Sequence, residues 1–110
     1  MKKVEAIINP FKLNSVKEAL DRTGIEEFVV SEVRGVGHQK GLPDVYRGSA
    51  FPVDFLPKLK VELVVNDYKA AQIVEAIRKA ARTGHVGDGK AYVLSVDSHV
   101  YMDERDSRTI

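Results

Sequence analysis

Two short apolar runs near the start of the chain are typical of β-strands. Residues 3–9 read Lys-Val-Glu-Ala-Ile-Ile-Asn, a run rich in strand-forming residues. Pro10 should end this strand, because proline has no N–H to donate to a sheet. Residues 28–33, Phe-Val-Val-Ser-Glu-Val, predict a second strand.

A helical pattern separates these two runs. Asn14 or Ser15 can cap a helix that extends to about Thr23. The apolar face of this helix would carry Val16, Ala19 and Leu20. Gly24 is a suitable residue to end the helix.

The same pattern occurs a second time. Residues 60–66, Lys-Val-Glu-Leu-Val-Val-Asn, repeat residues 3–9 at an offset of 57 with three conservative changes. At the same offset, four helix positions match as Val16, Glu18, Ala19 and Leu20 with Ile73, Glu75, Ala76 and Ile77. Residues 28–31 match residues 92–95 at an offset of 64, which places seven extra residues between helix and strand in the second copy. The chain therefore consists of two β-α-β units.

Two such units in one sheet predict a ferredoxin-like α+β fold of order β-α-β-β-α-β. We expect one domain over residues 1–110, with repeat one at 1–35, a long connecting loop at about 37–56, repeat two at 58–98 and an exposed tail at 99–110. One helix per unit covers one face of the sheet, so the other face should be covered by self-association.

Composition excludes several classes of function. A formal net charge of +1 over 110 residues gives no basic footprint for nucleic acid. The chain has no cysteine, which excludes a disulfide framework, a thiolate zinc site and a cysteine nucleophile, and is compatible with the cytosol. No signal peptide is apparent, and no apolar run approaches the ~18 residues of a membrane span.

The glycine-rich segment 81–90, Ala-Arg-Thr-Gly-His-Val-Gly-Asp-Gly-Lys, is the main candidate for ligand binding. It approaches a Walker A loop, but Ala91 replaces the Ser or Thr that binds magnesium, and the order is helix–loop–strand. Arg82 and Lys90 at its ends favour another kind of phosphate-binding loop. A plain glycine-rich connector is the alternative.

The loop between the repeats offers further candidates. Gln39 and Lys40, between two glycines, could present polar groups to a ligand or could simply belong to a polar loop. Lys58 could lie at the base of the loop or be a solvated lysine at a strand end. The side chains that could serve docking or modification are Tyr46, Ser49 and Phe51. Phe51 could equally fold back on the sheet.

Two kinds of catalytic or metal site find no support in the sequence. His38, His85 and His99 share no helical spacing and have no carboxylate cluster around them, which argues against zinc. Ser49 and Ser95 have no nearby His–Asp pattern, which argues against a hydrolytic triad.

Several motifs together resemble one family. They are residues 2–8 with Pro-Phe-Lys-Leu at 10–13, Gly-Val-Gly-His-Gln-Lys-Gly at 35–41, Tyr-Arg-Gly at 46–48, Asp-Phe-Leu-Pro-Lys at 54–58, and the glycine segment at 81–90. With these motifs the chain, through about residue 98, resembles the PII signal-transduction proteins, the nitrogen-status sensors of bacteria, archaea and plastids.

The resemblance implies a cytoplasmic homotrimer that binds ATP or ADP between subunits. The positions that it implies for nucleotide binding are Gly35, Gly37, His38, Glu62, Val64, Arg82, Thr83, Gly87, Asp88, Gly89 and Lys90. Gln39 occupies the position that ligates Mg²⁺ alongside ATP and 2-oxoglutarate, and Lys58 the position that pairs with the 2-oxoglutarate carboxylate. Lys40 and Gly41 would complete the effector site.

The resemblance also implies that the long connection is a T-loop that reports the ligand state to a target protein. Its docking residues would be Tyr46, Arg47, Ser49 and Phe51. A membrane transporter for ammonium or bicarbonate is the expected target, which would recruit the protein to the membrane.

This chain departs from the family pattern at several positions. Phe51 stands where many members carry a tyrosine that is uridylylated, and Asn9 replaces a basic residue near the 2-oxoglutarate site. Tyr101 and Asp103 occupy the positions of two arginines that contact phosphate from the neighbouring subunit. Carboxylate in place of guanidinium should weaken ATP most and favour ADP or AMP.

Two rival functions are weaker. A ferredoxin-like hydrolase of acylphosphatase type would use an Arg and an Asn near a phosphate loop, and turnover of acyl phosphate or ATP would favour it. No residue is placed as a general base, which favours a function by binding. An RNA-recognition sheet would need exposed aromatic residues on its central strands, which residues 3–9 and 60–66 do not supply.

Overall fold

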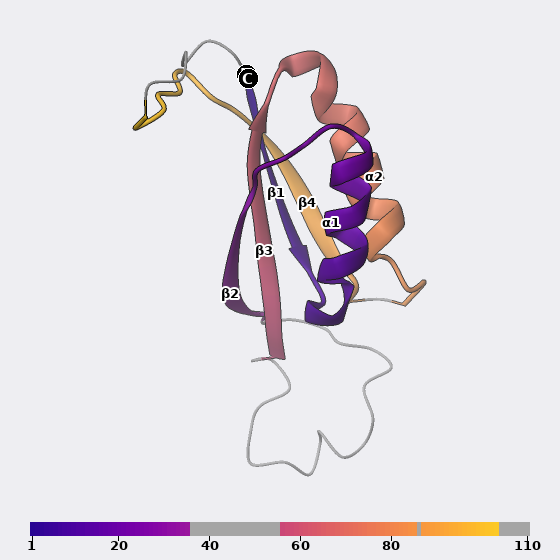
Figure 1. Cartoon of the computed structure of the whole chain (residues 1–110). Coiled ribbons are helices and arrows are strands. Elements are labelled where there is room, and N and C mark those ends of the chain that lie inside the picture. Colours follow the sequence, from indigo (N-terminus) through magenta and orange to yellow (C-terminus); the bar gives the residue numbers. More distant parts are fainter. Residues whose placement is uncertain (36–55, 86, 104–110) are drawn as a thin grey trace.

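The computed structural model describes residues 1–35, 56–85 and 87–103. Two β-α-β units follow one another along the chain (Figure 1). The first consists of β1 (Lys2–Ile8), a 3-10 turn (Pro10–Lys12), α1 (Leu13–Arg22) and β2 (Val29–Gly35). The second consists of β3 (Leu56–Val65), a 3-10 turn (Asp67–Lys69), α2 (Ala70–Ala81) and β4 (Gly89–Ser95).

The four strands form one antiparallel sheet of order β2-β3-β1-β4. Both helices lie side by side on one face of it (Figure 1). This confirms the predicted ferredoxin-like α+β fold. In the described part of the chain no helix is both long and apolar enough to span a membrane.

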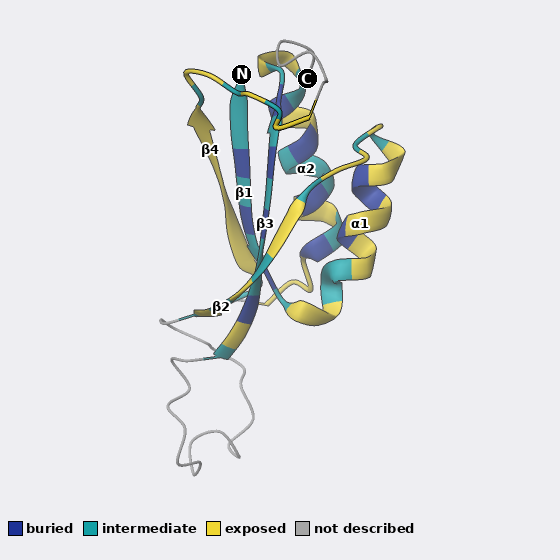
Figure 2. Ribbon diagram, turned by 60° about the vertical axis from the view of Figure 1, so that its left-hand side comes forward, coloured by how far each residue is buried: buried dark blue, intermediate teal, exposed yellow. Residues whose placement is uncertain are grey.

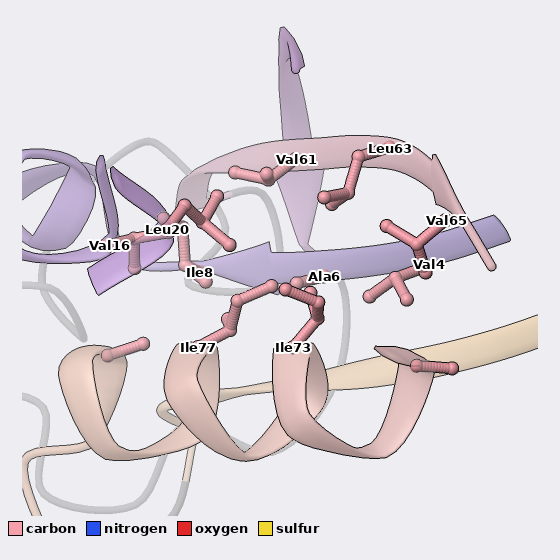
Figure 3. Packing of buried hydrophobic residues seen from close by; sticks show 12 residues of the cluster. Val4, Ala6, Ile8, Val16, Leu20, Val61, Leu63, Val65, Ile73 and Ile77 are labelled. Carbon is pink, nitrogen blue, oxygen red and sulfur yellow. The ribbon is translucent and has the colours of Figure 1, made fainter. Parts of the chain in front are cut away.

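The core lies between the sheet and the two helices. Alternate residues of β1 point toward the helices, and Val4, Ala6 and Ile8 are buried. Ile73 and Ile77 project from α2 onto β1 (Figure 3). Burial of each such side chain stabilises the fold by roughly 1.5–3 kcal/mol. The apolar residues of α2 recur at helical spacing because they all face the sheet.

The elements of the two units begin at positions that differ by the predicted offset of 57. The two 3-10 turns begin at Pro10 and Asp67, and the helices begin at Leu13 and Ala70. The predicted caps Asn14 and Ser15 are wrong, because both residues lie inside α1. Helical geometry starts earlier, at the proline, whose fixed φ angle suits the first position of a helix.

The predicted offset of 64 between the outer strands is also wrong. Val30 pairs with Val61 of β3, and Val93 pairs with Val4 of β1, the position equivalent to Val61. The equivalent positions are therefore 93 and 30, an offset of 63, and the second unit has six extra residues. A shift of one residue exchanges the two faces of a strand, so residue types alone had assigned the wrong face.

The face of the sheet away from the helices is polar at its centre. The Lys3 ammonium lies 2.9 Å from a Glu5 carboxylate oxygen and 3.0 Å from one of Glu62, while Lys60 lies 3.4 Å from Glu62. At one edge, every residue of β4 is exposed (Figure 2). Neither this face nor β4 is covered by a helix among the described residues.

Candidate functional site

The glycine segment begins where α2 ends. Ala81 is the last helical residue, and Arg82 turns into an extended conformation while its N–H donates to the Arg78 carbonyl at 3.2 Å. Gly84, Gly87 and Gly89 then adopt positive φ angles of 91°, 95° and 128°. Glycine takes such angles at little cost, which explains the composition of the segment.

Asp88 closes this loop upon itself. Its carboxylate accepts hydrogen bonds from the Thr83 N–H at 2.6 Å, from the Gly84 N–H at 3.0 Å and from the Thr83 hydroxyl. Partial burial raises the pKa of Asp88, but the Thr83 hydroxyl and the backbone N–H groups outweigh it, so this pKa is below its usual value. Thr83 and Asp88 thus organise the loop internally.

Gly89 fixes the loop to the sheet. A Cβ atom at this position would lie 1.9 Å from the Ile7 carbonyl oxygen, so no other residue fits without backbone movement. The segment was predicted as a loop through Lys90, but β4 already begins at Gly89, which pairs with Ile8. The missing side chain allows this close pairing, and Lys90 is held on a strand.

A pocket of about 290 Å³ opens beside the loop, between α2, β1 and β4. Its lining combines an apolar part with charged groups, namely Ala6, Ile7, Ile8, Val74, Ile77, Arg78, Ala81, Arg82, Asp88, Gly89, Lys90 and Ala91. Arg78 is paired with Glu75 at 2.7 Å, whereas Arg82 and Lys90 are exposed. The cations at the loop ends give the site a positive rim that suits an anion.

Lys58 is buried, with 6% of its surface exposed, so the alternative of a solvated lysine at a strand end is wrong. Its ammonium donates to the Asn9 side-chain oxygen and, at 3.0 Å, to the Gly87 carbonyl. Burial lowers the pKa of Lys58, and the negative charge of Asp88 opposes this effect.

Gly35, at the end of β2, packs on the stem of Lys58. A Cβ atom there would lie 3.3 Å from Lys58 Cγ. The structure therefore brings four predicted positions together at one end of the sheet: Gly35, Lys58, Gly87 and Asp88. The family resemblance placed Asn9 near the effector site, but the sequence did not predict its hydrogen bond with Lys58, which lies 49 residues away.

Glu62 and Val64 lie apart from this cluster. Glu62 pairs with Glu5 on β1, whereas Gly89 pairs with Ile8, three residues and roughly 10 Å farther along the strand. They line a second pocket of about 410 Å³ together with Lys3, Glu27, Phe28, Val29, Leu63, His99 and Tyr101. The Lys3 ammonium holds the pKa of Glu62 below its usual value. Within one chain, the predicted nucleotide residues thus form two separate groups.

The second pocket contains residues that the sequence did not single out as site residues. His99 and Tyr101 form an edge-to-face pair with ring centroids 4.7 Å apart. In the sequence, His99 stands out only as a possible zinc ligand, and Tyr101 only as a replacement for an arginine. Their separation by two residues is compatible with one shared side of an extended segment, which was the available signal.

The remaining predicted positions lie in the segment 36–55, outside the described residues. They are Gly37, His38, Gln39, Lys40, Gly41, Tyr46, Arg47, Ser49 and Phe51. Their assigned roles in nucleotide, effector, magnesium and partner binding stay predictions.

Comparison with known proteins places the chain in a family. The family model described as Nitrogen regulatory protein P-II matches residues 1–105. The protein named Nitrogen regulatory protein P-II of Rhizobium meliloti (strain 1021) is 55% identical over 97 residues, which are 88% of this chain and 87% of the relative. The protein of the same name from Synechocystis sp. (strain ATCC 27184 / PCC 6803 / Kazusa) is 52% identical over 112 residues, with all of both chains covered. The chain therefore belongs to the P-II family of nitrogen regulatory proteins, which are signal-transduction regulators and not enzymes.

Proposed function

We propose that this regulator senses adenine nucleotides together with 2-oxoglutarate and controls a target protein through its long loop. The observation that carries this proposal is the loop at the exit of α2. Asp88 closes it, Gly89 anchors it to β1, and Arg82 and Lys90 flank it with positive charge. A closed glycine loop between two cations suits a phosphate chain.

The nucleotide site is completed by a neighbouring subunit. The two groups of predicted residues lie at different places on one sheet, so a nucleotide held between neighbouring subunits could contact one group from each. The sheet face without helices and the exposed strand β4 supply the surface for a homotrimer. Light scattering should give three times the 12.2 kDa subunit mass, and a stable monomer would remove the premise.

The preferred nucleotide is ADP or AMP. Tyr101 and Asp103 replace two phosphate-contacting arginines, and each such contact is typically worth ~1.5–3 kcal/mol. Loss of both would weaken ATP binding by roughly two to four decades, and the penalty grows with the number of phosphates. Arg105 or Arg108 could compensate from the tail.

Calorimetric titration with AMP, ADP and ATP tests the proposal, each with and without Mg²⁺ and 2-oxoglutarate. We expect ADP or AMP to bind at least as tightly as ATP. The variant Asp103→Arg should strengthen ATP binding more than AMP binding. No binding of any nucleotide would refute the sensor function, and a clear preference for ATP that 2-oxoglutarate tightens would refute the altered selectivity.

The target is a membrane transporter of ammonium or bicarbonate, with Mg²⁺ and 2-oxoglutarate setting the state of the long loop through Gln39 and Lys58. Pull-down with the purified transporter, with and without each ligand, measures this step. Binding that no ligand changes would argue against control by these effectors.

A further inference from the structure

The pocket of about 290 Å³ extends beneath α2, on the helix side of the sheet. Its floor includes Ala91 of β4, which pairs with Ala6 of β1, and Ala6 is buried under the helices. Residues that pair across an antiparallel sheet share one face, so Ala91 also points toward α2. The wall that α2 contributes is apolar and consists of Val74, Ile77 and Ala81.

The first unit fills the equivalent place with large side chains. Phe28 is the equivalent of Ala91 at the offset of 63 between the outer strands, and Leu63 is the equivalent of Ala6 at the offset of 57. Leu63 is buried, and Phe28 packs against the core. The fold therefore closes this place in one unit and leaves it open in the other, because two alanines stand where the first unit has a phenylalanine and a leucine.

Two arginines border the apolar pocket. Arg78 binds Glu75 through its Nε and Nη2 groups, at 2.9 and 2.7 Å. Arg82 is exposed, so its guanidinium is accessible to a ligand. Asp88, the acidic residue of the lining, accepts hydrogen bonds from the N–H groups of its own loop. The pocket thus combines an apolar interior with a cation at its border.

This pocket lies on the other side of the sheet from two residues of the proposed nucleotide site. Successive residues of a strand point to opposite faces, so Lys90 points away from Ala91. Its ammonium lies 5.4 Å from the centre of the Tyr92 ring. Glu62 binds the Lys3 ammonium at 3.0 Å on that same face. A ligand beneath α2 would therefore be separate from a nucleotide at Lys90 and Glu62.

We propose that the pocket binds a small amphiphilic carboxylate, with a short apolar chain between α2 and Ala91 and the carboxylate on Arg82. This inference goes beyond the proposed nucleotide sensing and does not depend on it. The apolar lining favours a hydrocarbon chain, and the guanidinium selects an anionic head. The volume is small for a ligand pocket, which restricts the chain to a short one.

Calorimetric titration with octanoate tests the proposal, with acetate and octylamine as matched ligands. Octanoate should bind at least roughly tenfold more tightly than acetate, which lacks the long apolar chain. Octylamine has a chain of the same length and the opposite charge, and it should bind roughly tenfold more weakly than octanoate. Equal binding of octanoate and octylamine would indicate an apolar surface without selection for charge and would overturn the proposal.

Three variants locate the octanoate. Ala91→Phe gives the second unit the residue type of the first and fills the pocket, so octanoate binding should fall by more than about tenfold. Leu94→Ala is the control on the same strand, because Leu94 is exposed and pairs with Lys3 on the other face. It should leave octanoate binding unchanged. Arg82→Gln should weaken octanoate roughly tenfold and leave octylamine unchanged.

Two patterns among these variants contradict the assignment. Binding that persists in Ala91→Phe, or is lost in Leu94→Ala, places octanoate elsewhere. If octanoate does not bind at all and Ala91→Phe disrupts the oligomer, the pocket receives a side chain of a neighbouring copy, and the proposal is likewise overturned.

Methyl NMR of the unchanged chain does not depend on whether a variant folds. Octanoate should shift the methyl signals of Val74, Ile77 and Ala91, which line the pocket. The signals of Val64, in the second pocket, and of Leu94 should stay in place. Shifts at Val64 or Leu94 without shifts at Val74 and Ile77 would overturn the proposal.

Discussion

The two helices of this regulator perform the same task and end differently. After α1, Gly24 takes a φ angle of 85°, its N–H donates to the Asp21 carbonyl, and the Ile25 N–H donates to the Leu20 carbonyl. After α2, the N–H groups of Thr83 and Gly84 turn instead to the Asp88 carboxylate. The segment after α1, here called the first exit, satisfies the helix carbonyls, and the chain returns at once to the sheet. The segment after α2 is called the second exit.

The second exit uses the extra residues of the second unit. Its backbone donors are gathered around an internal carboxylate, and its cations Arg82 and Lys90 remain at the surface. The first exit stabilises the fold, whereas the second also carries the two cations of the proposed anion site. The comparison teaches that the extra residues of the second unit form the loop on which the proposed nucleotide site rests, while the repeat supplies its support.

The largest expected effect is that of Gly89→Ala, which attacks the anchor of the second exit. The added Cβ would lie 1.9 Å from the Ile7 carbonyl oxygen at a φ angle of 128°. The conformation alone costs about 1–3 kcal/mol, and the overlap adds to this. The unfolding temperature should fall by more than about 10 °C, since each kcal/mol lowers it by ~4–8 °C. A smaller fall would show that β1 and β4 can separate there.

Next in size is the pair Gly24→Ala and Gly84→Ala, one at each exit. Both glycines have φ angles near 90°, and the added Cβ would meet only Lys69 Nζ at 3.7 Å in the first case and nothing within 4 Å in the second. Each should cost about 1–2 kcal/mol where the backbone is held. Thermal unfolding should respond to Gly24→Ala, and nucleotide titration to Gly84→Ala alone. Equal effects of the two substitutions on nucleotide binding would contradict the assignment of the nucleotide site to the loop after α2.

Acid should weaken the loop after α2 by protonating Asp88. Because the pKa of Asp88 is below its usual value in the folded chain, its contribution to stability is complete above the ordinary carboxyl pKa of about 3.9. That contribution is lost as the pH falls through the lower folded-state pKa. The unfolding temperatures of the unchanged chain and of Asp88→Asn should differ by a constant amount above about pH 5. The difference should begin to shrink below about pH 4 and vanish below the folded-state pKa of Asp88.

Asp67 is the control for this measurement. The N-terminal ammonium, 2.7 Å away, holds the pKa of Asp67 below its usual value, and the Asp67 side chain is exposed. Salt should therefore shrink the effect of Asp67→Asn, whereas the effect of Asp88→Asn, which rests on neutral donors, should persist. Equal salt sensitivity would indicate that Asp88 acts as a simple surface charge.

The smallest expected effects come from Thr23→Val and Thr83→Val. The Thr23 hydroxyl donates to the Leu20 carbonyl at 2.6 Å within the first exit, and the Thr83 hydroxyl donates to Asp88 in the second. Each bond contributes about 1 kcal/mol. Thr23→Val should lower the unfolding temperature by a few degrees, while Thr83→Val should mainly accelerate hydrogen exchange of the loop. The reverse pattern would contradict the view that the Thr23 bond supports the whole fold and the Thr83 bond mainly the loop.

Much of this architecture could be predicted because it is repeated. The offset of 57 identified both units, since buried positions such as Val4 and Val61 keep the same residue type. The start of α1 was predicted wrongly from local sequence, because the helical geometry already begins at Pro10. The register of β4 was also predicted wrongly, because residue type does not specify strand pairing.

The burial of Lys58 could not be predicted from its neighbours in sequence. It depends on Asn9, Gly35 and Gly87, which come from three other parts of the chain. A lysine is usually solvated, and only the tertiary structure reveals an exception. The glycine loop, by contrast, could be identified because close backbone contacts require glycine locally.

The position of β1 in the sheet bears on how the chain is made. β1 leaves the ribosome before the other three described strands, yet both of its neighbours, β3 and β4, come from the second unit. Such long-range antiparallel pairing slows folding, and the nascent chain cannot complete its sheet before residue 95 has been synthesised. Neither repeat is an independent folding unit, although each has the pattern of one.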